Sequence, residues 1–146
     1  MHPLPHHYTV RAAVAPAGPV ALEATALPAL PSDAPAEFGG PGTLWSPETL
    51  LTAALADCFV LSFRAVAAAS RFDWTALHCE VEGTLDRVER VTQFTGFRLR
   101  ARLELPAGSD AARAGRLLEK AEQVCLISAS LKAPRHLETE IAIAAG

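Results

Sequence analysis

The sequence lacks a large excess of charge of either sign. Its 146 residues carry 13 lysines and arginines against 16 aspartates and glutamates, for a formal net charge of −3. Proteins that bind polyanions use many cations to neutralise phosphates, so this balance argues against nucleic acid or a membrane surface as a partner. Half of the residues are apolar and one fifth are charged, which is typical of a globular protein. We expect one domain over residues 1–146.

Cysteine is also scarce, because only Cys58, Cys79 and Cys125 are present. Three cysteines are too few, and odd in number, for the disulfide framework of a secreted domain. The first residues lack the basic start, apolar core and cleavage site of a signal peptide. We therefore expect a cytoplasmic location, in which a disulfide would be transient and catalytic rather than structural.

Motifs for metals and nucleotides are absent as well. The five histidines show no HExxH spacing, and the cysteines show no CxxC spacing, that would organise a metal site. The glycine-rich stretch Phe38–Gly42 contains a proline and is not followed by Lys-Ser or Lys-Thr, unlike a phosphate-binding loop. We expect neither a metal ion nor a bound cofactor.

One apolar stretch, residues 50–69, is long enough to span a membrane. It carries two charges, Asp57 and Arg64, and each costs about 3 kcal/mol near the centre of a span. Its many alanines contribute little to offset that cost. We therefore predict a buried helix of a globular core and no membrane contact.

The start of this helix is well marked. Ser46 can cap it, Pro47 suits its first position, and Glu48 places a negative charge where the helix dipole favours one. Apolar residues then recur at helical spacing and form a predicted core-facing stripe: Leu50, Leu51, Ala54, Leu55, Cys58 and Phe59. Cys58 is therefore expected on the buried side.

Two stretches, residues 77–86 and 97–105, alternate between apolar and polar side chains. This alternation predicts neighbouring antiparallel strands, with Cys79 on the inward face as core packing. The polar side of the first strand is acidic, and that of the second presents the arginine row Arg98, Arg100 and Arg102. Cross-strand pairs of opposite charge contribute roughly a few tenths of a kcal/mol each. We therefore interpret the arginine row as sheet surface rather than an anion site.

A second helix is predicted after the break at residues 106–109, and Pro134 ends it. Its predicted apolar face consists of Leu117, Leu118, Ala121, Val124, Cys125 and Ser128. A closing strand is expected over residues 137–143. Cys58 and Cys125 thus both fall in apolar stripes, where a cysteine often serves only as a small hydrophobic residue. Because they are far apart in the sequence, only the tertiary fold can bring the two sulfurs together.

The N-terminal part is predicted as a hairpin of residues 8–14 and 20–27, which completes the order ββ-α-ββ-α-β. Residues 28–42 follow with four prolines and three glycines. Such a composition indicates a long irregular loop of the kind that often covers or lines a site.

Three segments, Phe38–Gly42, Ser46–Cys58 and Glu122–Ser128, together resemble the OsmC/Ohr family of osmotically inducible and organic hydroperoxide resistance proteins. The most specific feature is Pro-Glu followed ten residues later by Cys, with a second Cys before a short hydroxyl-bearing run. The resemblance covers almost the whole chain. It implies an α+β OsmC-like fold with an antiparallel sheet, central cysteine-bearing helices and an intertwined homodimer with two sites at the subunit interface.

The resemblance also implies a function and the residues that perform it. In peroxidatic members the first cysteine attacks an organic hydroperoxide, the second resolves the sulfenic acid as a disulfide, and a dithiol regenerates the pair. By this resemblance Cys58 is the nucleophile, Cys125 the resolving thiol, and Glu48 the glutamate that holds an activating arginine. The implied activity is a thiol-dependent peroxidase in oxidative-stress defence.

The sequence departs from the family in two places. The stretch between Val14 and Leu44, where the family has its arginine, contains no arginine or lysine, and Leu126 replaces the usual proline. Apolar surroundings alone raise the pKa of a thiol, so Cys58 needs a cation or directed hydrogen bonds to react. An alternative function therefore stays open, namely a non-catalytic protein that binds a small hydrophobic or thiol ligand.

Glu48 precedes Cys58 by ten residues of the same predicted helix. A straight helix separates them by about 15 Å along its axis, beyond the reach of one carboxylate. If the two meet, the partner subunit must supply one of them, which predicts a composite site across a dimer. Glu48 could equally serve only as a favourable charge at a helix N-terminus.

Overall fold

The computed structural model describes residues 1–146, which form two compact units, residues 1–51 and 52–146. The first unit contains a sheet in the order β1-β2-β3, with both pairs antiparallel. Its elements are β1 (Arg11–Ala13), β2 (Val20–Glu23), β3 (Leu30–Ser32) and the 3₁₀ helix η1 (Ala36–Phe38). The predicted hairpin is confirmed in shorter form. The expected irregular loop over residues 28–42 is wrong in part, because it contains β3 and η1.

The first unit buries almost none of its apolar side chains. Among residues 1–51 only Ser32 and Ser46 are buried. Large apolar side chains are exposed instead, among them Tyr8, Val10, Val14, Leu27, Phe38 and Trp45. Backbone pairing holds this unit together, as where the Asp33 amide donates to the Trp45 carbonyl at 2.9 Å. Residues 1–51 therefore have no apolar core of their own.

Helix α1 (Pro47–Ala69) begins where the sequence predicts. The Thr49 amide donates to the Ser46 hydroxyl at 3.2 Å, and the Ser46 amide donates to the Thr49 hydroxyl at 2.9 Å. This reciprocal pair satisfies two amides that the first helical turn would leave without partners. Glu48 lies in the same first turn, as expected.

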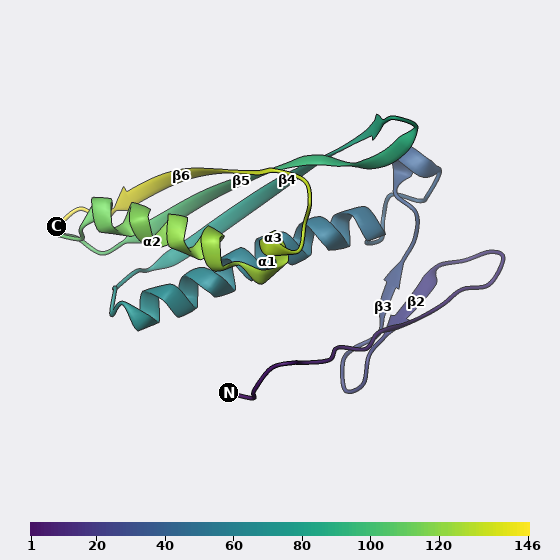
Figure 1. The fold of residues 1–146 in the computed structure, drawn as a ribbon, viewed down its shortest axis with the longest axis horizontal. Helices are drawn as coiled ribbons and strands as arrows, with labels where there is room; N and C mark the ends of the chain where they lie inside the picture. The colour runs from purple at the N-terminus through teal and green to yellow at the C-terminus, as the bar shows by residue number, and fades with distance from the viewer. The chain divides into compact units, whose positions relative to one another are not determined.

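The second unit contains a sheet in the order β4-β5-β6, with α1 and α2 lying along it (Figure 1). Its further elements are β4 (Ala76–Val88), β5 (Val91–Leu105), α2 (Ala111–Val124), α3 (Leu126–Ala129) and β6 (Arg135–Ile143). The β4–β5 pair is antiparallel, as predicted, but β5 and β6 are parallel. The expected antiparallel sheet is therefore confirmed for β4 and β5 and wrong for β5 and β6, because the helical connection returns the chain beside Phe97 so that β6 runs in the same direction as β5.

The apolar core lies between one face of this sheet and the two long helices. It contains Leu55, Phe59, Phe63 and Ala67 of α1, Phe97, Leu99, Ala101, Leu103 and Leu105 of β5, and Ala114, Leu118 and Ala121 of α2. The strand β5 is buried most fully because it has a neighbour on each side. The inward residues of the edge strand β4 are only half-buried, and Leu85, next to a bulge, is exposed.

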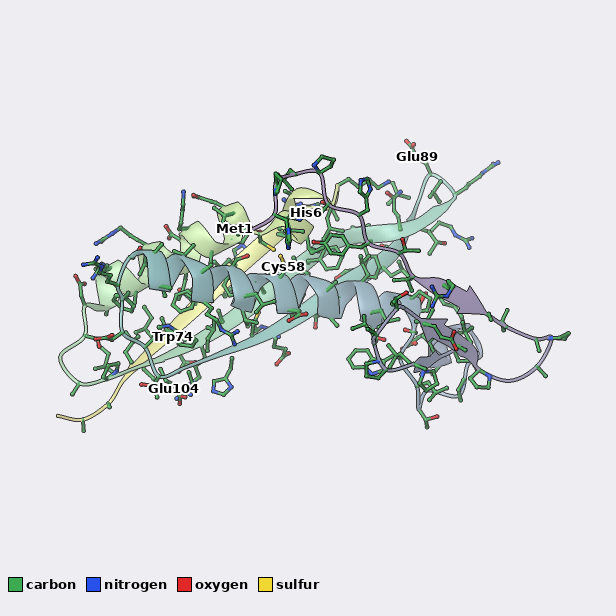
Figure 2. All side chains as sticks on the ribbon, turned by 90° about the horizontal axis from the view of Figure 1, so that it is seen from below. Met1, His6, Cys58, Trp74, Glu89 and Glu104 are labelled. Atoms are coloured by element: carbon green, nitrogen blue, oxygen red, sulfur yellow. The ribbon has the colours of Figure 1, made fainter.

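The opposite face of the sheet carries the arginine row. Arg100 faces Glu80 in the β4–β5 register and forms ion pairs with Glu80 at 3.3 Å and Glu138 at 3.5 Å. Arg98 and Arg102 also pair with glutamates of this face. The interpretation as sheet surface is confirmed. At one end of this sheet, Glu89 and Arg90 form the tip of the long β4–β5 hairpin, with φ of 50° and 69° (Figure 2).

Helix α1 is long and apolar enough to cross a membrane by length and composition alone, with a mean hydropathy of 1.7 over its best window. Its side with Leu55, Phe59 and Phe63 packs instead in the core of the second unit, while Asp57 and Arg64 are exposed. One-sided packing of this kind is typical of a core helix in a globular protein. The prediction of a buried helix is thus confirmed only for this side, because 22% of the best window is buried, and the absence of membrane contact stays a prediction.

Candidate active site

Cys58 lies midway along α1 (Figure 2). Its side chain is half-buried, between the fully buried Leu55 and Phe59 of the same helix. The Ser62 hydroxyl lies 3.9 Å from the Cys58 sulfur. Residues four apart share one helix face, so this spacing could have identified Ser62 from the sequence. The prediction that Cys58 faces the buried side is confirmed in part, because the thiol keeps some exposure.

Cys125 lies at a break in the backbone, where the sequence predicted a continuous helix. With φ −65° and ψ 111°, it ends α2 and begins α3. The Ser128 amide donates to the Cys125 sulfur at 3.5 Å, so the thiol acts as the cap of α3. The prediction of a continuous helix is wrong at this point. The sequence has no glycine or proline here that would indicate the break. The burial of Cys125 is confirmed, at 1% exposure, whereas Val124 is exposed.

The structure brings the regions of both thiols together, because Cys125 lies in the apolar core and Cys58 packs against the same core. Burial raises the pKa of Cys58, but hydrogen bonds from the Ile127 amide, the Cys125 thiol, the Ser62 hydroxyl and the Leu126 amide together bring it below the ordinary thiol value. Each of these groups stabilises the thiolate more than the thiol. Directed hydrogen bonds therefore lower the pKa of Cys58, and no cation is among the causes of this shift.

The pKa of Cys125 moves in the opposite direction, to about 11. Burial is the main cause, and the neighbouring Cys58 thiol raises this pKa further. Of the two thiols, Cys58 therefore loses its proton first, and Cys125 keeps its proton to higher pH. This difference suits Cys58 for attack on an electrophile and leaves Cys125 as a neutral thiol beside it.

Cys79 packs against the apolar core, as the sequence predicts. Its pKa rises to about 11, chiefly through burial and further through the charge that Cys125 can carry. All three cysteines are free thiols. Cys79 is thus a core residue whose thiol stays protonated near neutral pH. No hydrogen bond lowers its pKa, in contrast to Cys58.

The structure leaves the predicted role of Glu48 untested. Glu48 belongs to residues 1–51, whereas every group that acts on the pKa of Cys58 belongs to residues 52–146. Glu48 and Cys58 lie ten residues apart on α1. Its action on Cys58 stays a prediction.

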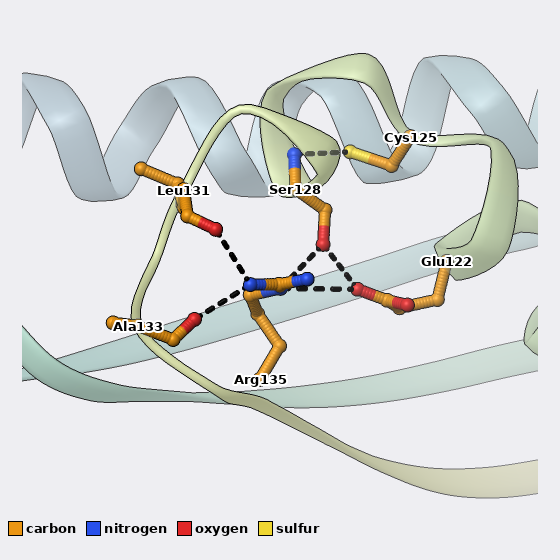
Figure 3. Close-up of polar contacts among 6 residues, drawn as sticks. All are labelled: Glu122, Cys125, Ser128, Leu131, Ala133 and Arg135. Atoms are coloured by element: carbon orange, nitrogen blue, oxygen red, sulfur yellow. Dashed lines mark hydrogen bonds and ion pairs between the residues drawn. The ribbon is translucent and has the colours of Figure 1, made fainter.

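A polar cluster that the sequence analysis missed lies beside Cys125 and consists of Glu122, Ser128 and Arg135 (Figure 3). The Arg135 Nε donates to the Ser128 hydroxyl at 2.7 Å, and that hydroxyl donates to Glu122 at 2.5 Å. Arg135 also forms an ion pair with Glu122, at 3.8 Å. The only sequence signal was the helical spacing of Glu122 and Cys125, because the position of Arg135 depends on the turn into β6.

No group of three or more histidine, cysteine, aspartate or glutamate side chains is arranged to hold a metal ion. Around Cys58 the structure places a second thiol, the Ser62 hydroxyl and two backbone amides. Such a set can stabilise a thiolate and bring a second sulfur to it.

Comparisons with known proteins agree with the architecture. The family described as OsmC-like protein matches residues 40–140. The uncharacterized protein YmaD of Bacillus subtilis (strain 168) is 28% identical over 115 residues, which are 77% of each chain. An OsmC-like protein of unknown function from Vibrio cholerae superposes with a TM-score of 0.84 at 16% identity, over 92% of this chain and 99% of that one.

A solved structure also carries a functional name. The organic hydroperoxide resistance protein OsmC of Legionella pneumophila superposes with a TM-score of 0.74 at 25% identity, over 94% of this chain and 97% of that one. Together with the family match over residues 40–140, these likenesses confirm the α+β OsmC-like fold. The chain belongs to the OsmC-like protein family.

Proposed function

We propose that this protein is a thiol-dependent peroxidase that reduces organic hydroperoxides through Cys58 and Cys125. The observation that carries the proposal is the placement of Cys58 of α1 and Cys125 of the α2–α3 break at one apolar core, where the pKa of Cys58 is lowered and that of Cys125 is raised. A peroxidase needs a thiolate for attack and a second thiol close enough to capture the product. The likeness to the Legionella hydroperoxide resistance protein supports the same activity.

The reaction proceeds in two steps. The Cys58 thiolate attacks one oxygen of the hydroperoxide, the O–O bond breaks, and the alcohol leaves with a proton taken from water, so that Cys58 becomes a sulfenic acid. Cys125 then attacks the Cys58 sulfur, and its proton leaves with the hydroxyl group as water. A disulfide forms, and an external dithiol reduces it by thiol–disulfide exchange.

The same proposal includes a homodimer, because the chain exposes apolar residues that a second copy would cover. Residues 1–51 bury no apolar side chain. In the second unit Leu61, Val124 and Leu126 are 47%, 47% and 67% exposed, close in sequence to the two cysteines. Such exposure near a site is typical of an interaction surface. In this dimer Glu48 of one subunit would complete the site of the other, and the protein would act in the cytoplasm.

The first test treats reduced protein with one equivalent of an organic hydroperoxide. We expect a loss of two hydrogens by intact mass and a bridge between Cys58 and Cys125 in non-reducing peptide maps. A Cys79→Ser variant is the matched control and should give the same bridge. Unchanged thiols in folded protein would contradict the peroxidase. Sedimentation at micromolar concentration tests the dimer separately, and a monomer alone would contradict it.

A second function is favoured by one observation, the absence of any arginine or lysine between Val14 and Leu44. A protein without the activating arginine of peroxidatic members could retain the interface pocket only to bind a small hydrophobic or thiol ligand. In that case hydroperoxide would leave the thiols unchanged, and the protein would still bind such a ligand. The mass measurement above therefore separates the two functions.

A further inference from the structure

The segment from Cys125 to Ala133 supplies most of the groups that stabilise the Cys58 thiolate. The amides of Leu126 and Ile127 and the thiol of Cys125 all come from it, and only Ser62 comes from α1 itself. This segment contains α3, which has four residues, and otherwise no regular element. A single helical turn is not stable alone, so other contacts must hold these donors in place.

Arg135 provides those contacts from the first residue of β6. Its Nη1 donates to the Leu131 carbonyl at 3.0 Å and to the Ala133 carbonyl at 2.6 Å. Its Nε donates to the Ser128 hydroxyl, and Glu122 at the end of α2 balances its charge. The side chains of Arg135 and Glu122 are 24% and 23% exposed, so water screens these contacts only in part. The guanidinium thus joins α2, the Cys125–Ala133 segment and β6.

Ser128 connects this clamp to the thiols. Its hydroxyl accepts from Arg135 and donates to Glu122, while its amide donates to the Cys125 sulfur at 3.5 Å (Figure 3). Cys125 in turn donates to Cys58. Ser128 is 1% exposed, so losing a partner would leave one of its polar groups buried without a hydrogen bond, which is costly. Hydrogen bonds thus link Arg135 to Ser128 and Ser128 to Cys125, and Cys125 is one of the groups that lower the pKa of Cys58.

We propose that Arg135 is a positioning residue which, with Glu122 and Ser128, fixes the Cys125–Ala133 segment so that its donors face Cys58, and which thereby sets the reactivity of Cys58 without touching it. This inference deepens the proposed peroxidase and names the residues that replace an activating cation near the nucleophile. It concerns the thiolate itself, so its test needs no hydroperoxide.

The test measures alkylation of Cys58 by iodoacetamide as a function of pH, in a Cys79→Ser background with peptide mapping. Arg135→Met should move the Cys58 profile toward higher pH by about one pKa unit, which is about a tenfold slower reaction at neutral pH. Ser128→Ala retains the amide that caps Cys125 and loses only the hydroxyl link. It should shift the profile in the same direction by a smaller amount. Arg135→Lys, which keeps one charged donor, should restore part of the reactivity.

Arg100→Met is the matched control, because it removes an arginine with two ion pairs on the far face of the same sheet. Its alkylation profile should match that of the parent. Circular dichroism establishes that each variant is folded, and Ser128→Ala decides the matter if Arg135→Met unfolds. If Arg135→Met and Ser128→Ala are both folded and both give the alkylation profile of the parent, the inference is overturned. If Arg135→Met unfolds, a parental profile in Ser128→Ala alone overturns it. A shifted profile in a protein that consumes no hydroperoxide would refute the peroxidase and leave the positioning role standing.

Discussion

Cys58 and Cys125 belong to one pair, yet they differ in backbone, exposure and acidity. Cys58 lies inside a regular helix and is half-buried, whereas Cys125 lies at the break between α2 and α3 and is fully buried. The pKa of Cys58 is lowered, and that of Cys125 is raised to about 11. Burial raises the pKa of both thiols and is the main cause of the rise at Cys125, so the lowered pKa of Cys58 needs a further cause.

The direction of the hydrogen bonds explains it. Cys58 accepts from the Leu126 and Ile127 amides, which the break at Cys125 leaves without helical acceptors. Cys125 accepts from amides as well, but it must also donate to Cys58, and that bond raises its pKa. The break in the helix therefore produces both effects, because it frees the amides and directs the second thiol. A regular helix through Cys125 would provide neither.

The largest expected effect comes from removing the acidic member of the pair. Cys58→Ser leaves a hydroxyl that does not ionise near neutral pH, so hydroperoxide consumption should fall to background, a loss of at least about a thousandfold. A dithiol-coupled consumption assay measures the rate. Cys79→Ser is the matched control and should retain the parental rate. Substantial turnover in Cys58→Ser would show that another thiol is the nucleophile.

Substitutions of Cys125 sharpen the comparison. Cys125→Ala removes the donor to Cys58, whereas Cys125→Ser replaces it with a hydroxyl donor. A hydrogen bond to a charged group contributes about 1.5–3 kcal/mol, so Cys125→Ala should raise the pKa of Cys58 by about one to two units. Cys125→Ser keeps a donor and should restore part of the difference. The pH dependence of Cys58 alkylation gives both values. Equal profiles for Cys125→Ala and the parent would contradict a donating Cys125.

The same two variants test the resolving role. Without a second thiol, hydroperoxide should carry Cys58 beyond the sulfenic acid to the sulfinic acid, a gain of two oxygens by intact mass. The parent treated in the same way should lose two hydrogens instead. Formation of a disulfide in Cys125→Ala would assign the resolving role to Cys79.

Much of the fold followed from periodicity. The strand β5 alternates over residues 97–105, and the cap at Ser46 marks the start of α1, because both depend on neighbours in the sequence. The closing strand β6 followed as well, but its parallel direction and the short strand β3 did not. Strand direction depends on where the α2–α3 connection returns the chain, and a three-residue strand containing Pro31 carries little local signal.

The candidate site was predictable only in its residue types. The cysteines were found from their motifs, but the break at Cys125 was missed because a thiol is an unusual helix cap and no glycine or proline marks it. The donors to Cys58 are largely backbone amides, which any residue could supply. Arg135 joins Ser128 and Glu122 across the turn into β6, and neither spacing nor composition indicates that contact. Local pattern thus locates the nucleophile, while its activation depends on tertiary structure.

The smallest expected effect is on the pH dependence of the unfolding free energy. This dependence has one sign for the thiols with a raised pKa and the opposite sign for Cys58. A folded-state pKa raised to about 11, as for Cys125 and Cys79, stabilises the fold below the ordinary thiol pKa, and this stabilisation is lost as pH rises toward 11. Cys79→Ser removes one such group and should reduce the loss of unfolding free energy between about pH 8 and 10. Cys58 has the opposite sign, because its lowered pKa stabilises the folded state as pH rises, so Cys58→Ser should steepen the loss. Urea unfolding at several pH values measures both, and equal slopes in the two variants would contradict the assigned directions.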